Sequence, residues 1–203
     1  ITQLIYQHST SVPSLEINAE TTFEEAINQK FIEYLGKSIS EIATSLNIAV
    51  SPSRPKNFNH ILASKILSFA KKPISEFEKA GIILKTIQLD NKGRLKESMS
   101  FSQINFDEIN KQTWEDSNFA SDLERKFLFV VFKLNENNTN ILEKVFFWNM
   151  PFSDREQAKK VWLETQKKLR IDSSNLPKSS ENPIAHVRPK ARNSRDKLRA
   201  PDG

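Results

Sequence analysis

A charged stretch ahead of a short β-branched run carries the residues whose spacing could support metal-dependent hydrolysis. Glu76 and Glu78 precede Gly81, and Lys85 lies inside the apolar run that follows. Because strand side chains alternate between two faces, Lys85 shares a face with the residue two positions before it. In many metal-dependent nucleases that position is a carboxylate, which binds a divalent cation together with an earlier acid, while the lysine stabilises the attacking water or the phosphate charge. Here that position is Ile83, so one acid of the arrangement is missing.

Each of these residues also has a structural interpretation. A buried charge is costly unless it is paired, so Lys85 is either a site residue or a side chain on the solvent face of a hairpin. Glu76 and Glu78 are either cation ligands or surface charges of a loop. Since Ile83 leaves one good carboxylate to face a cation, and Mg²⁺ binds through one or two carboxylates plus phosphate oxygens and water, we expect at most a weak metal site.

Other catalytic chemistries lack their residues. The chain has no cysteine, which excludes disulfides and thiolate metal sites. Its four glycines form no phosphate-binding loop, and no spacing indicates a Ser-His-Asp arrangement. The histidines share no metal-ligand spacing: they are His8, His60 and His186.

The charge distribution favours a polyanionic partner, most of all near the C-terminus. The net charge is +5 and the sequence pI about 9.3. Segment 178–203 is basic, and it contains side chains of the types that bind guanine and adenine edges in the major groove. These candidates are Arg188, Lys190, Arg192 and Asn193. The alternative is a solvated tail that binds phosphates without specificity, or binds nothing.

Length and composition predict one folded domain. The chain has 203 residues, of which 37% are hydrophobic, and its 14 phenylalanines are enough for a core. We expect a lead-in or linker remnant over residues 1–21 and a domain over 22–203. No run is long and apolar enough to cross a membrane, and no signal peptide is recognisable, so a cytoplasmic location is expected. The ends at Ile1 and Gly203 look cut, which suggests a fragment of a longer protein.

Periodicity and capping residues predict a mixed α/β fold. Thr22 with Glu25, and Ser38 with Glu41, form capping boxes that begin two helices. The order expected is helices, hairpin, strand, strand, helix and strand. In residues these are helices over 22–35, 39–46 and 57–70, a hairpin over 81–102 with its turn at 90–93, strands at 127–132 and 145–148, a long helix capped by Ser153 and Glu156, and a short strand at 184–188.

Three blocks in the correct order resemble the MutH mismatch-repair endonuclease and its restriction-enzyme relatives, which act at GATC. The run from Gly81 to Arg94 resembles the family's signature strand and turn. Thr113-Trp114-Glu115 resembles its TWE triplet, and the block from Arg188 to Ala191 resembles its RPKA segment. The resemblance covers residues 22–203 and implies a restriction-endonuclease-like core, a mixed central sheet flanked by helices.

The same resemblance implies a degenerate active site. The first acid of the family falls on Glu76 and the lysine is kept as Lys85, but the glutamate before it falls on Ile83. An earlier helical glutamate falls on or near Ser64, and a lysine expected after the tryptophan falls on Asp122. Loss at several points of one site is what a domain released from catalysis would show.

Some GATC-cutting type II restriction enzymes of the Sau type resemble two fused copies of this fold, one catalytic and one silent. The chain is most similar to the silent C-terminal copy, which binds a second DNA site and activates the first. This implies no catalytic residue and no metal or other cofactor in this domain, Mg²⁺ in the catalytic domain of the parent chain, and GATC duplex DNA, that catalytic domain and a homodimer on DNA as partners. Expected DNA contacts are Arg188, Lys190, Arg192 and Asn193, with Lys85 and Arg94 near the cleft.

Two alternatives stay open. An active Mg²⁺-dependent endonuclease domain would use Glu76, Lys85 and another carboxylate such as Glu97 on the returning strand of the hairpin. A module that kept the fold without binding DNA would serve only protein contacts or dimerisation.

Overall fold

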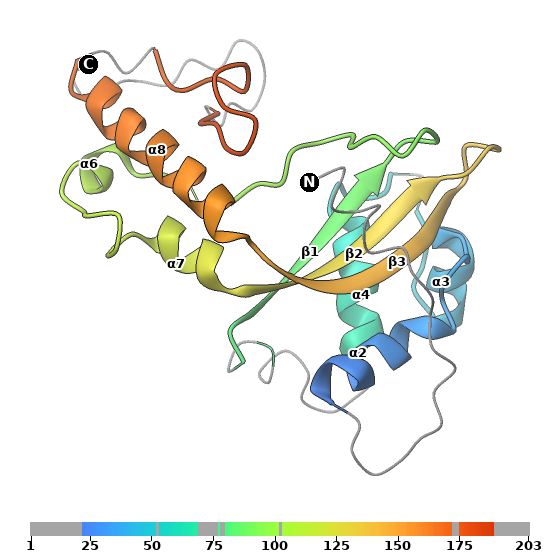
Figure 1. Cartoon of the computed structure of the whole chain (residues 1–203). Coiled ribbons are helices and arrows are strands. Elements are labelled where there is room, and N and C mark those ends of the chain that lie inside the picture. The colour runs from blue at the N-terminus through green and yellow to red at the C-terminus, as the bar shows by residue number, and fades with distance from the viewer. Residues whose placement is uncertain are drawn as a thin grey trace. The chain divides into compact units, whose positions relative to one another are not determined.

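The computed structural model describes residues 22–51, 53–68, 77, 80–101, 103–171 and 175–188. The chain divides into two compact units, each considered by itself (Figure 1). Unit 1 comprises residues 1–99 and 126–148, and unit 2 comprises residues 100–125 and 149–203. The expected lead-in, residues 1–21, lies outside the described residues.

Unit 1 is built on a three-stranded sheet with the order β1-β2-β3. The strands are β1 (Ile82–Leu89), β2 (Lys126–Leu134) and β3 (Asn140–Asn149). β1 runs parallel to β2, with Ile82 opposite Lys126 and Leu89 opposite Lys133. The apolar run in β2 is buried from Phe127 to Phe132, as expected for a strand covered on both faces. The mixed sheet flanked by helices confirms the predicted fold class.

Three helices cover one face of this sheet: α2 (Phe23–Ile32), α3 (Ile39–Ser45) and α4 (Phe58–Ser68) (Figure 1). Their apolar stripes pack with Ile82 and with alternate residues of β2 in one core. Both predicted capping boxes are confirmed: the side chains of Thr22 and Ser38 accept the backbone N–H of Glu25 and Glu41, whose carboxylates accept in return. These caps fix where α2 and α3 begin.

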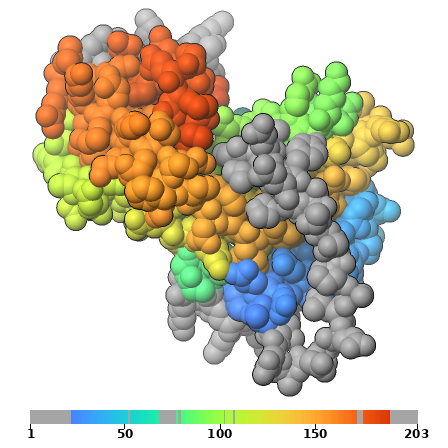
Figure 2. Space-filling view, viewed as in Figure 1, coloured from blue at the N-terminus to red at the C-terminus, as the bar shows by residue number. Residues whose placement is uncertain are grey.

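Unit 2 contains α6 (Phe106–Ile109), α7 (Asn118–Glu124) and α8 (Phe152–Leu169). Figure 2 shows the side chains of α8, in orange, at the surface of this unit. Its inner side buries Ala158, Val161, Trp162 and Thr165. The Gln166 amide donates to the backbone oxygens of Ile109 and Gln112, which ties α8 to the end of α6 and to the segment after it.

Three predicted elements differ from the structure. The returning strand of the hairpin shrinks to one bridge, Leu89 with Leu95, because the chain leaves the sheet after that pair. α8 begins after Pro151 without a side-chain cap, since the Ser153 hydroxyl donates to Asp154 instead of capping the helix. The strand predicted at 184–188 is irregular and keeps one long-range backbone hydrogen bond, from Val187 to Pro177.

The third predicted helix is confirmed over Phe58–Ser68, and its last two predicted residues, 69 and 70, lie outside the described residues. The strand predicted at 145–148 is longer in the structure and covers Asn140–Asn149. Among the described residues, no helix combines the length and hydropathy that a membrane span requires.

Candidate functional site

Ile83 and Lys85 lie on one face of β1, two residues apart, as the nuclease arrangement requires. Their partners across the parallel ladder are Phe127 and Phe129. The rings of these two phenylalanines stack with centroids 5.7 Å apart and nearly parallel planes, and the Trp148 ring lies 5.8 Å from the first and 5.3 Å from the second. The face that would hold a cation in a nuclease is therefore flanked by packed aromatic rings.

These surroundings do not fit a Mg²⁺ site. A hard cation needs several oxygen ligands, and Ile83 with its neighbours on β2 offers hydrocarbon in their place. Across the part of the chain that the structure describes, no group of three His, Asp or Glu side chains is placed to hold a metal ion. Glu76 and Glu78, the expected first acids, lie outside that part.

The other two degenerate positions belong to different units. Ser64 is half-buried in α4 of unit 1. Asp122 lies in α7 of unit 2, where its carboxylate is 3.8 Å from the guanidinium of Arg125, three residues later. The Asp122 carboxylate therefore has a cationic neighbour within its own helix.

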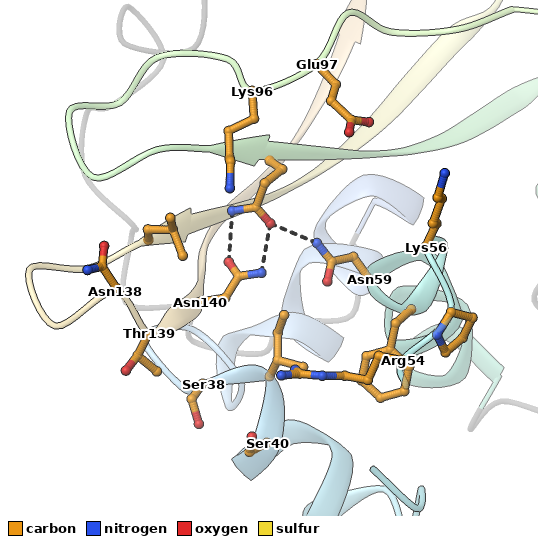
Figure 3. Close-up of a pocket in the computed structure, with 15 residues that line it drawn as sticks. Ser38, Ser40, Arg54, Lys56, Asn59, Lys96, Glu97, Asn138, Thr139 and Asn140 are labelled. Atoms are coloured by element: carbon orange, nitrogen blue, oxygen red, sulfur yellow. Dashed lines mark hydrogen bonds between the residues drawn. The ribbon is translucent and has the colours of Figure 1, made fainter. Parts of the chain in front are cut away.

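A polar pocket of about 620 Å³ opens at the C-terminal end of β1 in unit 1 (Figure 3). Its lining brings together the loop before α4, the end of β1, the segment after the β1 turn and the connection between β2 and β3. Three cationic side chains line it, Arg54, Lys56 and Lys96, against one carboxylate, that of Glu97. The pocket can therefore attract an anionic group.

Three carboxamide side chains form a hydrogen-bonded set in this pocket: Asn59 of α4, Gln88 of β1 and Asn140 of β3. Gln88 and Asn140 bond reciprocally, with Nε2 to Oδ1 at 3.0 Å and Nδ2 to Oε1 at 2.7 Å. The Oε1 of Gln88 also accepts from Nδ2 of Asn59 at 3.1 Å, and its Nε2 donates to the Leu89 carbonyl at 2.9 Å. This set, here called the amide triad, joins a helix to two strands (Figure 3).

Glu97 lines the pocket beside Lys96, and Lys85 does not. Gln88, which lines the same pocket, is three residues beyond Lys85 and so points to the opposite face of β1. The structure therefore groups Glu97 with the amide triad and not with the nuclease-like face, where the alternative of an active enzyme would need it.

Arg94 is fixed at the tight turn after β1. Its Nε donates to Oδ2 of Asp90 at 2.8 Å, and its backbone N–H donates to Oδ1 at the same distance. These bonds, first the backbone one, lower the pKa of the Asp90 carboxyl. Arg94 stays 69% exposed and does not line the pocket. The Arg94 side chain holds a turn that includes Gly93, the residue just before it, which has a positive φ.

The C-terminal candidates are described only as far as Arg188, an exposed residue that follows the Val187–Pro177 hydrogen bond. Lys190, Arg192 and Asn193 lie outside the described residues. The nearby turn is well anchored, because the Asn182 side chain accepts two backbone N–H groups and Glu181 pairs with Lys168 at 3.3 Å.

The Thr113-Trp114-Glu115 triplet has a structural role in unit 2. The Trp114 ring packs edge-on against Phe119 and Trp162, at 5.9 Å from each centroid. The Glu115 carboxylate accepts from Lys159 of α8 at 2.9 Å, which lowers the pKa of Glu115 and raises that of Lys159. The triplet thus holds the start of α7 against α8.

Sequence reasoning missed the pocket. Arg54 lies in a segment recognised only as a proline-rich loop, and Gln88 in a run recognised only as a strand. One signal was present: Gln88 is an uncharged polar residue among β-branched and leucine residues, where a side chain must find partners if it is buried. Its partners, Asn59 and Asn140, are 29 and 52 residues away in sequence.

Comparison with known proteins agrees with the fold. A family model described as the DNA mismatch repair enzyme MutH matches residues 67–161. The type II restriction enzyme Sau3AI of Staphylococcus aureus is 31% identical over 209 residues, covering 86% of this chain and 42% of that enzyme. The DNA mismatch repair protein MutH of Pectobacterium atrosepticum is 25% identical over 182 residues, covering 85% of this chain and 77% of that protein.

The chain thus spans less than half the length of the Staphylococcus enzyme. The sequence blocks, the mixed sheet and these matches agree with one another. Together they show that the chain is similar to the MutH mismatch-repair enzyme and to the Sau3AI restriction enzyme.

Proposed function

We propose that this chain is a non-catalytic DNA-binding domain of a type II restriction endonuclease that recognises GATC. It binds a second copy of the site and activates a separate catalytic domain of the parent chain, which uses Mg²⁺. The observation that carries this is the contrast on β1: the nuclease-like face has Ile83 beside Phe127 and Phe129, whereas the end of the strand opens on a pocket with three cationic side chains.

The resemblance to MutH and to Sau3AI supports DNA as the ligand, since both relatives are named as proteins that repair or restrict DNA. The charge supports it as well: the chain carries +5 overall, three cationic side chains line the pocket against one carboxylate, and segment 178–203 is basic. A metal is not needed for binding of this kind, because lysine and arginine side chains neutralise phosphates directly.

Activation is a matter of linkage between two sites. DNA bound to this domain favours the state of the parent enzyme in which the catalytic domain is competent. The free energy of this shift equals the difference in DNA-binding free energy between the two states. Arg188, Lys190, Arg192 and Asn193 are proposed contacts to bases and phosphates, and Lys85 is a proposed phosphate contact. A homodimer on DNA is the form we expect the parent enzyme to adopt when active.

The test is fluorescence anisotropy of a labelled GATC duplex against the isolated chain, at several salt concentrations and without a divalent cation. Affinity should fall steeply with salt, with a slope of about −0.9 for each neutralised phosphate. A scrambled duplex should bind at least about tenfold more weakly, since each wrong base pair costs about 1–3 kcal/mol. A flat salt response, or equal affinity for both duplexes, would refute the proposal. Charge reversal at Arg188 and at Lys190 should weaken binding. A module that does not bind DNA would instead show no binding in the wild type, and the same charge reversals would leave the parent enzyme unaffected.

A further inference from the structure

We propose that Asn59 is a specificity-determining residue, which hydrogen-bonds the N6/N7 edge of an adenine in bound DNA, and that Gln88 and Asn140 are the residues that position it. This inference rests on the proposed function, because it takes DNA as the ligand of unit 1. It assigns a role to the amide triad, which is remote in sequence from the basic C-terminal segment.

The argument begins with the hydrogen bonds that the triad already makes. The carboxamide of Gln88 offers two donors and two acceptor positions, and all four are used: by Asn59, twice by Asn140, and by the Leu89 carbonyl. Gln88 therefore has nothing left to offer a ligand. Its four bonds fix its own orientation, and through it the orientation of its two partners.

Asn59 is the opposite case. Its Nδ2 donates one hydrogen bond, to Gln88, and its Oδ1 accepts none from the described residues. The side chain is half-buried and lines the pocket (Figure 3). Among the described residues, one N–H and the carbonyl oxygen of the Asn59 carboxamide thus have no partner at the pocket.

That pair of groups selects a class of ligand. A phosphate offers acceptors only, so it leaves the Asn59 oxygen unpaired. A base edge with an adjacent donor and acceptor satisfies both groups, and the N6 amino group with N7 of adenine is the edge that asparagine binds with two hydrogen bonds.

The charges of the same pocket suit the rest of a nucleotide. Arg54, Lys56 and Lys96 line the pocket that Asn59 also lines, and each is exposed and can approach a phosphate. Glu97 is the one carboxylate in the lining, so the three cations outnumber it. The pocket thus has the two kinds of contact expected at a DNA interface: the cations neutralise the phosphate backbone, and the carboxamide recognises the base.

Positioning by Gln88 and Asn140 lowers the entropic penalty of binding, because a side chain that is already fixed loses little freedom when it binds. It also explains why polar residues occur at the end of β1 and the start of β3. Apolar residues there would leave Asn59 without a partner to orient it.

The experiment replaces single atoms of the DNA. A GATC duplex is prepared with 7-deazaadenine, which lacks the N7 acceptor, at each adenine in turn, and its affinity for the full 203-residue chain is measured by anisotropy. For at least one adenine, the wild type should bind the modified duplex at least about fivefold more weakly. Asn59→Ala should bind the normal and modified duplexes equally, with an unchanged salt slope.

Three variants keep the result interpretable. Lys56→Ala should reduce the salt slope by about 1 and keep the discrimination against 7-deazaadenine. Asn149→Ala, an exposed asparagine outside the pocket, should behave as wild type. Gln88→Leu leaves Asn59 in place and removes its anchor, so it should reduce the discrimination while retaining the salt slope. Melting curves confirm that each variant is folded.

The outcomes separate the two proposals. If the wild type prefers GATC but Asn59→Ala still discriminates against 7-deazaadenine, or if no adenine N7 matters to the wild type, the inference is wrong and the proposed function stands. If the wild type binds no DNA, the proposed function fails.

Discussion

Two parts of one strand in unit 1 have opposite surroundings. Ile83 and Lys85 lie opposite Phe127 and Phe129, whose rings are packed with Trp148. Gln88, at the other end of β1, makes four side-chain hydrogen bonds in a pocket lined by cations. The first part has hydrocarbon and aromatic neighbours where a metal would need oxygen ligands, whereas the second has polar groups that a ligand can use. The comparison teaches that the loss of a carboxylate at one end of a strand need not remove the polar groups at its other end.

The largest effect is expected from Phe129→Ala at the aromatic end. Phe129 is 3% exposed and contacts Phe127, Phe146 and Trp148, so its truncation should leave a cavity and lower the free energy of unfolding by about 3–5 kcal/mol. Urea unfolding measures this loss in the free energy of unfolding. Phe152→Ala, at a position 69% exposed, is the matched control and should cost far less. Equal losses in the two variants would show that this end is not core.

Ile83→Glu restores the acid that the nuclease arrangement lacks. It should lower the free energy of unfolding by about 1–3 kcal/mol, because it places a carboxylate beside aromatic rings. Millimolar Mg²⁺ should not restore the melting temperature of Ile83→Glu. The uncharged control, Ile83→Gln, should likewise show no change in melting temperature with Mg²⁺. Stabilisation of the glutamate variant alone by Mg²⁺ would reveal a surviving cation site and break the comparison.

Gln88→Leu tests the polar end. The substitution removes four hydrogen bonds and leaves Asn59 and Asn140 to find other partners, so we expect a loss of about 1–3 kcal/mol in the free energy of unfolding. In a double-mutant cycle with Asn140→Ala, the two losses should be clearly less than additive. Additive losses would mean that the amide triad does not act as a unit.

The smallest effect is expected from Glu115→Gln in unit 2. The hydrogen bond from Lys159 lowers the pKa of Glu115 below its ordinary value of 4.5, so its contribution to stability is present above 4.5 and is lost as pH falls through the lowered pKa. Lys159 has its pKa raised above 10.5 by the same bond, so its contribution holds below 10.5 and is lost as pH rises through the raised value. Because the pair is exposed, the variant should melt slightly below wild type at pH 7. The difference should shrink as pH falls through the lowered pKa of Glu115, and a difference that stays constant with pH would point to another cause.

Local signals predicted the elements that depend on local chemistry. The capping boxes at Thr22 and Ser38 and the apolar run of β2 are such cases, since each is determined within a few residues. Errors occurred where tertiary contacts decide. Leu95 makes a single bridge to Leu89, and α8 begins after Pro151 although Ser153 and Glu156 resemble a capping box.

The candidate site shows the same division. Ile83 and Lys85 could be assigned to one face of a strand from the period of two alone. The pocket could not be predicted, because Arg54, Asn59, Gln88 and Asn140 come from four separate segments that meet only in the folded unit. The resemblance to the MutH family assigned roles to the catalytic positions, which lie away from the C-terminal end of β1.

One measurement tests most directly whether binding and hydrolysis are separate. The isolated chain is incubated with a labelled GATC duplex and Mg²⁺, and each sample is divided between a native gel, which reports binding, and a denaturing gel, which reports strand cleavage. The account predicts a shifted band with intact strands, and a much weaker shift for a scrambled duplex. Cleavage at GATC that is lost in Lys85→Ala would contradict it, because the nuclease-like face of β1 would then still be catalytic.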